Sequence, residues 1–468
     1  MDPFEQKIKT YARQETISVP DGFDERIEKK LTVLPTGKSK TRTSFKVLLV
    51  ATVFLVLSAV TVWASPTVQR MAQGMIAYFS PEQESAYSSL QEELQQYNSA
   101  AGVAAQDQGI TLKIDNIAVD DGYINVFYTV QSNSPITIVG SENTPMAWRL
   151  SWTAPVLYFQ ADGQDIDLPA LIERESYLEN DTILKGMERF AVVQSLPDNF
   201  RLEIWTEHIF GVQGNWRVAL DIDKSPPTAD TLVVTPGIQT SVTSGWDQPY
   251  RHNITVDKVL ISPFGSQLVL KEMSVDGKFF GEASFALCDE QGRFLDVIPS
   301  QRWAAPDKKT MEVTNSFEFL NGNTDMKSLT LIPLAFNIKK IIQADGSSSP
   351  VLTASPLDRI PFRLEQNTKG TIVVDQVTVS EKEVKITYHS EGILDLPHFF
   401  LLDENNREIE GLKLAVDRGV DRKKGQQIMT YTFTSHPDAA EIARIKRLGT
   451  PTYDLKLRAE EQIVIPLR

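Results

Sequence analysis

The longest apolar segment of the chain runs from Val47 to Ala64, and no charged residue occurs between Val47 and Gln69. A helix rises about 1.5 Å per residue, so about 20 residues cross the roughly 30 Å hydrocarbon core of a bilayer. Signal-peptide apolar regions are shorter, roughly 7–15 residues, and they follow a short basic segment. We therefore predict a transmembrane helix over residues 46–65. Cleavage after Val62-Trp63-Ala64 and a buried core helix are the alternatives.

The charges that flank this segment indicate its orientation. The nearest charge on its carboxyl side is Arg70, whereas four basic residues lie directly before it: Lys38, Lys40, Arg42 and Lys46. Basic flanks stay on the cytoplasmic side, so we predict a single-pass cell-membrane protein with a cytoplasmic N-terminus and an extracellular C-terminal bulk. Residues 1–46 carry ten Lys/Arg against seven Asp/Glu, and the remainder carries 37 against 54. The acidic outer part argues against direct nucleic-acid binding.

An internal repeat organises the outer part. Three segments share the form apolar-x-apolar-Asp-x-apolar-x-apolar and align without a gap: LKIDNIAV (Leu112–Val119), ITVDKVLI (Ile254–Ile261) and IVVDQVTV (Ile372–Val379). Alternation with period two predicts a strand in each. Asp115, Asp257 and Asp375 shift the apolar phase by one residue, as a bulge does. We expect each carboxylate to accept a hydrogen bond from a neighbouring backbone amide, with a ligand-binding role as the alternative.

Further strand patterns follow each copy. An aromatic strand ends in a turn at Asp162, Asp289 or Asp403, and aspartate is typical of such hairpins. The segments WRVALDI, IPFRLE and IVIPLR are interpreted as the closing strands of the three units. Units of roughly 100–130 residues built from short strands predict a mainly β fold of three tandem antiparallel Ig-like β-sandwiches. The predicted ranges are 105–225, 229–366 and 367–468.

Residues 66–104 are predicted to form a stalk that contains one helix. Ser80-Pro81-Glu82-Gln83 has the pattern of an N-cap, a proline at the first helical position and a capping-box glutamine. Apolar residues then recur at helical spacing, and Gly102 is expected to end the helix; the stripe is Tyr87, Leu90, Leu94 and Tyr97. We expect this stripe to pack on the first sandwich, with a dimer seam as the alternative.

The cytoplasmic segment, residues 1–45, shows two short amphipathic helical patterns. Two such helices share too little surface to be stable alone, and helices of this kind gain order by laying their apolar faces on a partner. The predicted partner-binding residues are Phe4, Ile8 and Tyr11 in the first pattern and Phe23, Ile27, Leu31 and Leu34 in the second. A tail that only sets topology through its charges is the alternative.

No arrangement of residues indicates catalysis or a cofactor, and we expect a protein that is not an enzyme. The five histidines share no metal-ligand spacing, and the sequence motifs of hydrolases, phosphate-binding loops and zinc proteases are absent. The single cysteine, Cys288, excludes an intramolecular disulfide, and its apolar neighbours favour a buried thiol. Four tryptophans fall in the first outer unit, where core positions are favoured over an aromatic ligand groove: Trp148, Trp152, Trp205 and Trp216.

Several segments resemble a group of firmicute membrane proteins with one membrane helix and an uncharacterised extracellular domain. These segments are ISVPDGFDERIEKKL, ASPTVQRMAQGMIAYF and GITLKIDNIAVDDGYINVFYTV, and HNITVDKVLISPFGSQL resembles a second domain that often follows. The resemblance extends from about Val19 to about residue 366. Members are described as anti-sigma-factor-like, because their genes tend to lie beside those of extracytoplasmic-function sigma factors. The resemblance implies that Phe4–Leu34 binds such a sigma factor and that the sandwiches form the sensor.

Two functions are compatible with these features. In the first, the outer sandwiches sense an envelope condition through an unknown extracellular ligand, and the inner helices hold or release a transcription regulator. In the second, the chain is a surface adhesion or envelope-structural protein whose tail is only an anchor. The two differ in whether residues 1–45 bind a partner.

Overall fold

The computed structural model divides the chain into two compact units, Met1–Arg70 and Met71–Arg468. The structure describes residues 91–468 except 98, 141–143, 145, 167–170, 229, 248, 276–283, 307–311, 343–345, 410 and 436. The predicted transmembrane helix at 46–65 and the cytoplasmic segment at 1–45 lie outside the described residues. Within the described ranges, no helix has both the length and the apolar character needed to cross a membrane.

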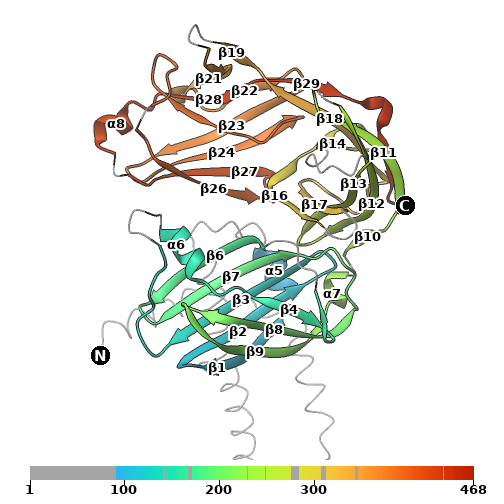
Figure 1. Ribbon diagram of the computed structural model, residues 1–468, viewed down its shortest axis with the longest axis vertical. Helices are drawn as coiled ribbons and strands as arrows, with labels where there is room; N and C mark the ends of the chain where they lie inside the picture. The colour runs from blue at the N-terminus through green and yellow to red at the C-terminus, as the bar shows by residue number, and fades with distance from the viewer. Residues whose placement is uncertain are drawn as a thin grey trace, which may run out of the picture. The chain divides into compact units, whose positions relative to one another are not determined.

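The described part of the chain is mainly β, in antiparallel sheets (Figure 1), as the sequence predicts. The first sandwich, blue and green in Figure 1, packs one sheet of order β1-β2-β3-β7-β6 against another of order β5-β4-β8-β9. The first sheet contains β1 (Ser99–Asp107), β2 (Ile110–Val119), β3 (Tyr123–Ser132), β6 (Leu171–Asn180) and β7 (Ile183–Ala191). The second contains β4 (Tyr158–Ala161), β5 (Gln164–Asp165), β8 (Asn199–Ile209) and β9 (Val212–Asp223), and helix α6 (Met146–Thr153) precedes β4.

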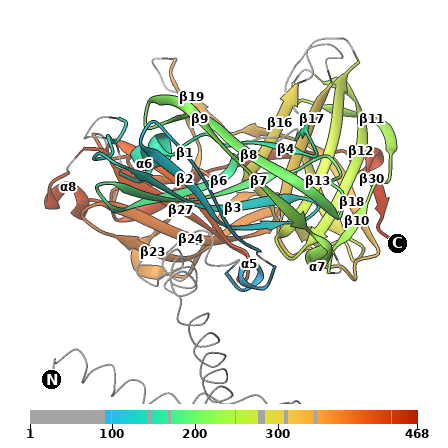
Figure 2. The same cartoon turned by 90° about the horizontal axis from the view of Figure 1, so that it is seen from below.

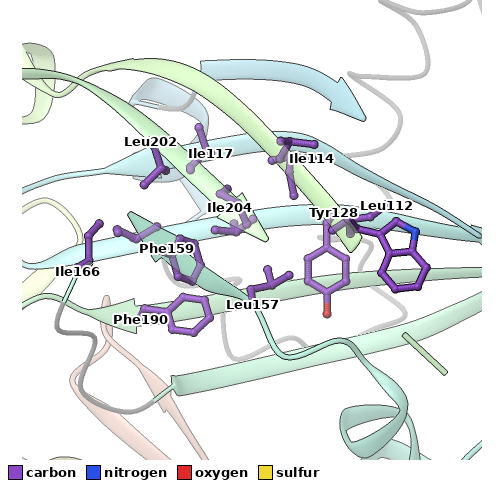
Figure 3. Close-up of a cluster of buried hydrophobic side chains, with 14 of the residues drawn as sticks. Leu112, Ile114, Ile117, Tyr128, Leu157, Phe159, Ile166, Phe190, Leu202 and Ile204 are labelled. Carbon is purple, nitrogen blue, oxygen red and sulfur yellow. The ribbon is translucent and has the colours of Figure 1, made fainter. Parts of the chain in front are cut away.

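The core of this sandwich comes from the alternating apolar positions of both sheets. Leu112 and Ile114 of β2 face Leu202 and Ile204 of β8 across the core (Figure 3). Each of these four side chains is fully buried, and burial of such a side chain contributes about 1.5–3 kcal/mol. The period-two pattern of the sequence thus sets which face of each strand turns inward.

The second sandwich repeats the strand order of the first. One sheet has the order β10-β12-β13-β17-β16, with β11 also paired to β12, and the other has β15-β14-β18-β29, with β30 also paired to β18. The first sheet contains β10 (Leu232–Val234), β11 (Ile238–Ser244), β12 (Tyr250–Ser262), β13 (Gly265–Ser274), β16 (Val297–Pro306) and β17 (Val313–Phe319). The second contains β14 (Ser284–Asp289), β15 (Phe294–Leu295), β18 (Ser328–Ile338), β29 (Tyr453–Leu457) and β30 (Ile463–Pro466). The short helix α7 (Ser225–Thr228) lies between the first two sandwiches in the chain.

The third sandwich is inserted between β18 and β29 of the second. Its sheets have the orders β22-β23-β24-β27-β26 and β21-β28-β25. The larger sheet contains β22 (Phe362–Asn367), β23 (Gly370–Val379), β24 (Glu383–Gly392), β26 (Leu414–Asp421) and β27 (Gln426–Phe433). The smaller contains β21 (Leu352–Pro356), β25 (Phe400–Leu402) and β28 (Arg447–Pro451). Other elements of this region are the hairpin β19 (Lys340–Ile342) and β20 (Ser348–Pro350), helix α8 (Ala439–Ala443) and the 3-10 helices η2 (Leu357–Arg359) and η3 (Ala459–Glu461).

For two of the three predicted closing strands the assignment to a sandwich is wrong, and the three sandwiches do not follow one another in a purely tandem order. IPFRLE contains β22, which pairs with β23 and opens the third sandwich. IVIPLR contains β30, which pairs with β18 and completes the second sandwich (Figure 2). A period-two pattern identifies a strand but not its partner, and consecutive strands are neighbours only about two-thirds of the time. The prediction for WRVALDI is confirmed, because β9 pairs with β8.

The three repeated aspartates are confirmed as bulges, but the predicted backbone caps are wrong. The strand register shifts by one residue at each of them, at Asp115 in β2, Asp257 in β12 and Asp375 in β23. Each carboxylate contacts a side chain 14 residues later, on the paired strand, and Lys113 and Gln426 also bind Asp115 and Asp375. The pairs are Asp115–Thr129 at 2.6 Å, Asp257–Lys271 at 3.0 Å and Asp375–His389 at 2.9 Å. The bulge turns the carboxylate toward the neighbouring strand, so a side chain of that strand binds it.

The predicted stalk helix ends earlier than expected. Helix α5 (Gln91–Tyr97) is followed directly by β1, and Gly102, with φ of 60°, lies inside β1 beside a register shift. Leu94 is fully buried among residues of the first sandwich and of the β12–β13 turn, so the predicted packing is confirmed for this residue. Tyr87 and Leu90 lie outside the described residues.

Several smaller expectations are confirmed by the structure. The carboxylates of Asp289 and Asp403 accept hydrogen bonds from backbone N–H groups within their own turns. Cys288 is buried in β14, and its burial raises the pKa of the thiol to about 11. Trp216 is a core residue, whereas Trp152 is 53 % exposed and Trp205 stacks on Tyr158 at the surface of β4 and β8.

Candidate functional site: a charged junction between three sandwiches

The sheet β1-β2-β3-β7-β6 of the first sandwich is buried on both faces. Tyr123 and Phe127 of β3 and Met187 of β7 point away from the sandwich core. They form a separate apolar cluster with Leu260 and Phe264, which belong to the second sandwich. The sheet face opposite the sandwich core is therefore an interface within the chain.

Four buried charges occupy this interface, and we call them the charged junction: Glu173, Arg189, Glu318 and Arg422. Arg189 lies in β7, and its guanidinium binds both oxygens of Glu318 in β17, at 2.8 Å from Nη1 and 3.0 Å from Nη2. Nη2 also donates to the Phe264 carbonyl at 2.6 Å. The guanidinium carbon lies 3.9 Å from the centre of the Tyr123 ring. Arg189 thus joins the first sandwich to the second through charge, hydrogen bonds and ring stacking.

Arg422 brings the third sandwich to the same carboxylate. It lies in the turn between β26 and β27, and its Nε and Nη2 donate to Glu318 at 2.8 and 3.1 Å. Nη2 also donates to Glu173 of β6 at 2.9 Å. Glu173 lies 3.8 Å from Nη1 of Arg189, which closes a ring of alternating charges. One residue from the second sandwich and one from the third therefore meet two from the first.

The junction is balanced in charge and almost excluded from water. The side chains of Arg189 and Glu318 are 0 % and 3 % exposed. Burial alone would raise the pKa of Glu318, but the charges of Arg189 and Arg422 outweigh it and lower the pKa to about 2. Burial also raises the pKa of Tyr123, whose ring stacks on Arg189. Glu318, Arg189 and Arg422 therefore stay ionised at neutral pH.

This arrangement is suited to coupling sandwiches and not to chemistry. It contains no nucleophile paired with a base, and Arg189, Glu318 and Arg422 are each bound by two or more partners. Replacement of a buried ion pair by apolar residues is often neutral for stability, whereas removal of one partner is costly. In some proteins such networks favour one docking arrangement over the others. The junction therefore links the positions of the three sandwiches.

A lysine makes a second contact between the first and second sandwiches. Lys258 of β12 donates to the carbonyl oxygens of Asp121 and Val192, at 3.0 and 2.7 Å. Burial lowers the pKa of Lys258 to about 8, against the opposing effect of nearby carboxylates. The Asp121 carboxylate is in turn bound by Lys224, which follows β9. This contact lies at the turn between β2 and β3, and β3 pairs with β7, the strand that contains Arg189.

A carboxyl group lies at the contact between the second and third sandwiches. Asp296 lies between β15 and β16, and Ser390 of β24 donates to it from both its hydroxyl and its backbone N–H. Burial raises the pKa of Asp296 to about 7, although nearby His389 acts in the opposite direction. His389 is also the partner of the bulge residue Asp375. This contact therefore carries a charge that depends on pH near neutrality.

Gly265, the first residue of β13, is required by the junction. Its φ of 143° disfavours a side chain, and an added Cβ would lie 2.6 Å from Glu318 Oε1 and 2.8 Å from Arg189 Nη2. We expect Gly265→Ala to destabilise the protein by about 1–3 kcal/mol more than Gly163→Ala, because it adds a clash to the backbone strain. Gly163 also has positive φ, 78°, but nothing lies within 4 Å of its added Cβ. Thermal unfolding of the two variants measures the difference, and equal losses would contradict the expectation.

The residues predicted from the sequence to bind a partner lie outside the described residues: Phe4, Ile8, Tyr11, Phe23, Ile27, Leu31 and Leu34. The junction, in contrast, was not predicted. One signal for it was present in β3, where Tyr123 and Phe127 are large apolar residues that alternate with the core residues Ile124, Val126 and Tyr128. Glu318 and Arg422 carry no comparable local signal.

The chain matches one family model, and two of the solved structures similar to it are described below. The model is described as "Domain of unknown function (DUF4179)" and matches residues 39–132, less than a quarter of the chain. The match includes the predicted transmembrane helix and β1, β2 and β3 of the first sandwich. No curated protein matches the chain.

The two structures are only distantly similar. "The crystal structure of the conserved domain protein from Bacillus anthracis" has 12 % identity and a TM-score of 0.38, over 55 % of this chain and 86 % of that one. "Crystal structure of Down Syndrome Cell Adhesion Molecule (DSCAM) isoform 1.30.30, N-terminal eight Ig domains" has 10 % identity and a TM-score of 0.15, over 78 % of this chain and 43 % of that one. At these TM-scores neither structure establishes a shared fold or function for this chain.

Proposed function

We propose that the chain is a membrane-anchored signalling regulator of the anti-sigma-factor-like type. In this proposal residues 46–65 span the cell membrane, and three Ig-like sandwiches form an extracellular sensor. The cytoplasmic segment, residues 1–45, binds an extracytoplasmic-function sigma factor. The observation that carries the proposal is the match of the domain of unknown function over residues 39–132, together with the firmicute resemblance of the same segment.

The charged junction supports the sensory role. A signal at one sandwich reaches a membrane helix only if the sandwiches move together, and the junction connects all three. The first sandwich, which contains Arg189 and Glu173, is the one nearest to the predicted membrane helix in the sequence. The proposed regulator acts by binding.

The proposed topology has a direct test. We expect protease added to intact protoplasts to digest residues from about Pro66 onward and to spare a tag at the N-terminus, because the membrane shields the cytoplasmic segment. Western blotting against both ends measures the result. A soluble product in the medium that starts near Ser65 would instead identify the apolar segment as a signal peptide.

The regulatory role is tested at the predicted binding face. Burial of one large apolar side chain contributes about 1.5–3 kcal/mol, so Ile27→Asp should weaken partner binding tenfold or more. The freed sigma factor should then raise its target transcripts. Glu28→Gln, on the opposite face of the same predicted helix, is the matched control and should change little. Transcript sequencing of both variants measures the effect.

A negative result would favour the second function. If Ile27→Asp and deletion of residues 2–36 both leave the transcriptome unchanged, while removal of the sandwiches alters envelope integrity or adhesion, the chain is a surface adhesion or envelope-structural protein.

A further inference from the structure

The core of the second sandwich contains a cavity of about 240 Å³. Its walls come from both sheets, with Leu268 and Phe317 on one side and Leu287 and Leu331 on the other. Loop 394–396 of the third sandwich completes the wall. The cavity therefore lies between two sandwiches, and apolar side chains make up most of its lining.

A cavity of this size is unusual inside a folded protein. Protein interiors are packed as densely as organic crystals, with few voids larger than a water molecule. A cavity of about 150 Å³ lined by aliphatic and aromatic side chains stays dry and binds benzene. In proportion, 240 Å³ accommodates a molecule of about ten non-hydrogen atoms.

Two polar residues, Ser284 and Asp395, line the cavity, and the carboxyl group of Asp395 gives it a preferred ligand chemistry. Asp395 lines the wall beside Leu394 and Leu396, and its backbone N–H donates to Gln366 at 2.8 Å. The Tyr453 hydroxyl donates to its carboxyl group, while burial raises the pKa of Asp395. A carboxyl group accepts more than one hydrogen bond, so a ligand donor has a place beside Tyr453. The acidic character of residues 47–468, with 54 Asp/Glu against 37 Lys/Arg, disfavours an anion.

We propose that this cavity binds a small, uncharged hydrophobic molecule of about ten non-hydrogen atoms whose single hydrogen-bond donor faces Asp395. The ligand replaces missing van der Waals contacts between the two sheets and touches loop 394–396 of the third sandwich. Its occupancy therefore changes the contact between the second and third sandwiches. That this contact carries a signal rests on the proposed function, whereas the binding itself does not.

The test uses the purified full chain in lipid nanodiscs, with indole as the probe. Indole has nine non-hydrogen atoms and one N–H donor. Naphthalene has a similar shape and no donor, and indole-3-acetate carries a negative charge. Because a net hydrogen bond contributes about 0.5–1.5 kcal/mol, we expect indole to bind two- to tenfold more tightly than naphthalene. Indole-3-acetate should bind more weakly than either. Isothermal titration against empty nanodiscs measures all three.

Variants locate the binding within the cavity. Leu331→Phe fills part of the space and should abolish indole binding while the thermal transition is retained; Val297→Phe serves the same purpose if the first variant does not fold. Asp395→Leu should remove the preference for indole over naphthalene, and Asp395→Asn, which keeps an acceptor, should retain it. Indole binding that is absent, or equal in the wild type and the filled variants, would overturn the proposal. Equal affinity for indole and naphthalene would overturn the role of Asp395. Binding without any change in target transcripts would count against the proposed function alone.

Discussion

Glu318→Gln should weaken the docking of the three sandwiches by about 3–5 kcal/mol, the cost of breaking a buried ion pair by removing one partner. The variant leaves Arg189 with Glu173 at 3.8 Å as its nearest carboxylate. Arg422 keeps its contact to Glu173 but loses one of its two acceptor oxygens at residue 318, because glutamine has an NH2 group in place of one carboxylate oxygen. We expect calorimetry to resolve separate unfolding transitions for sandwiches that unfold together in the wild type.

The matched control is Asp221→Asn, which removes the partner of Arg201 at an exposed site. The side chains of this pair are 58 % and 86 % exposed, and exposed ion pairs contribute about 0.2–1 kcal/mol. A Glu318→Gln protein that unfolds like Asp221→Asn would show that the junction does not couple the sandwiches.

A second variant separates stability from docking specificity. Replacing Glu173, Arg189, Glu318 and Arg422 together by Leu, Met, Leu and Met removes all four charges of the junction. Such replacements are often neutral or stabilising. This variant should therefore have an unfolding temperature at least as high as that of Glu318→Gln. Hydrogen exchange at the interface should nevertheless be faster than in the wild type, because the apolar contact accepts more than one arrangement.

Stability should fall as pH rises from about 4 to about 7, and Asp296 should be a main cause. Burial raises the pKa of its carboxyl group from 3.8 to about 7. Within that window the folded protein holds the proton and the unfolded chain does not, so folding becomes less favourable as pH rises. Below the window both states are protonated and no cost arises. Above it the full cost applies, on the order of 4 kcal/mol at about 1.4 kcal/mol per pKa unit.

Asp296→Asn isolates this contribution. The variant should match the wild type near pH 4 and exceed it in stability near pH 8, because asparagine carries no charge to bury. Asp325→Asn, whose side chain is 88 % exposed, should show no such change with pH. Thermal unfolding between pH 4 and pH 8 measures the three proteins. A constant difference between Asp296→Asn and the wild type across this range would contradict the assignment.

Local patterns account for the parts of the fold that could be predicted. The alternation in LKIDNIAV predicts both a strand and its bulge, because a one-residue shift in apolar phase has few other causes. The bulge partner could not be predicted. The carboxylate of Asp115 is bound by Lys113, two residues before it, and also by Thr129, which lies on the paired strand and not beside it in the chain. Side-chain distances across strands depend on register, and register becomes visible only in the folded sheet.

The pairing of β30 and the position of Arg422 depend on long-range topology. Ile463 and Ile465 have the same alternation whether their strand closes the second sandwich or the third. Their core position in the second sandwich follows from an insertion of the third sandwich before them. Arg422 is a turn residue in a polar run, and only the docking of its turn onto β6 and β17 shows that it is buried.

The proposed regulator depends most directly on what the cytoplasmic segment binds. The decisive measurement is affinity capture of the full chain, tagged at its C-terminus and crosslinked in intact cells, from wild type, Ile27→Asp and Glu28→Gln, followed by mass spectrometry. We predict that an extracytoplasmic-function sigma factor is recovered with the wild type and with Glu28→Gln, and at least tenfold less with Ile27→Asp. Recovery of no sigma factor, or equal recovery with all three proteins, would contradict the account.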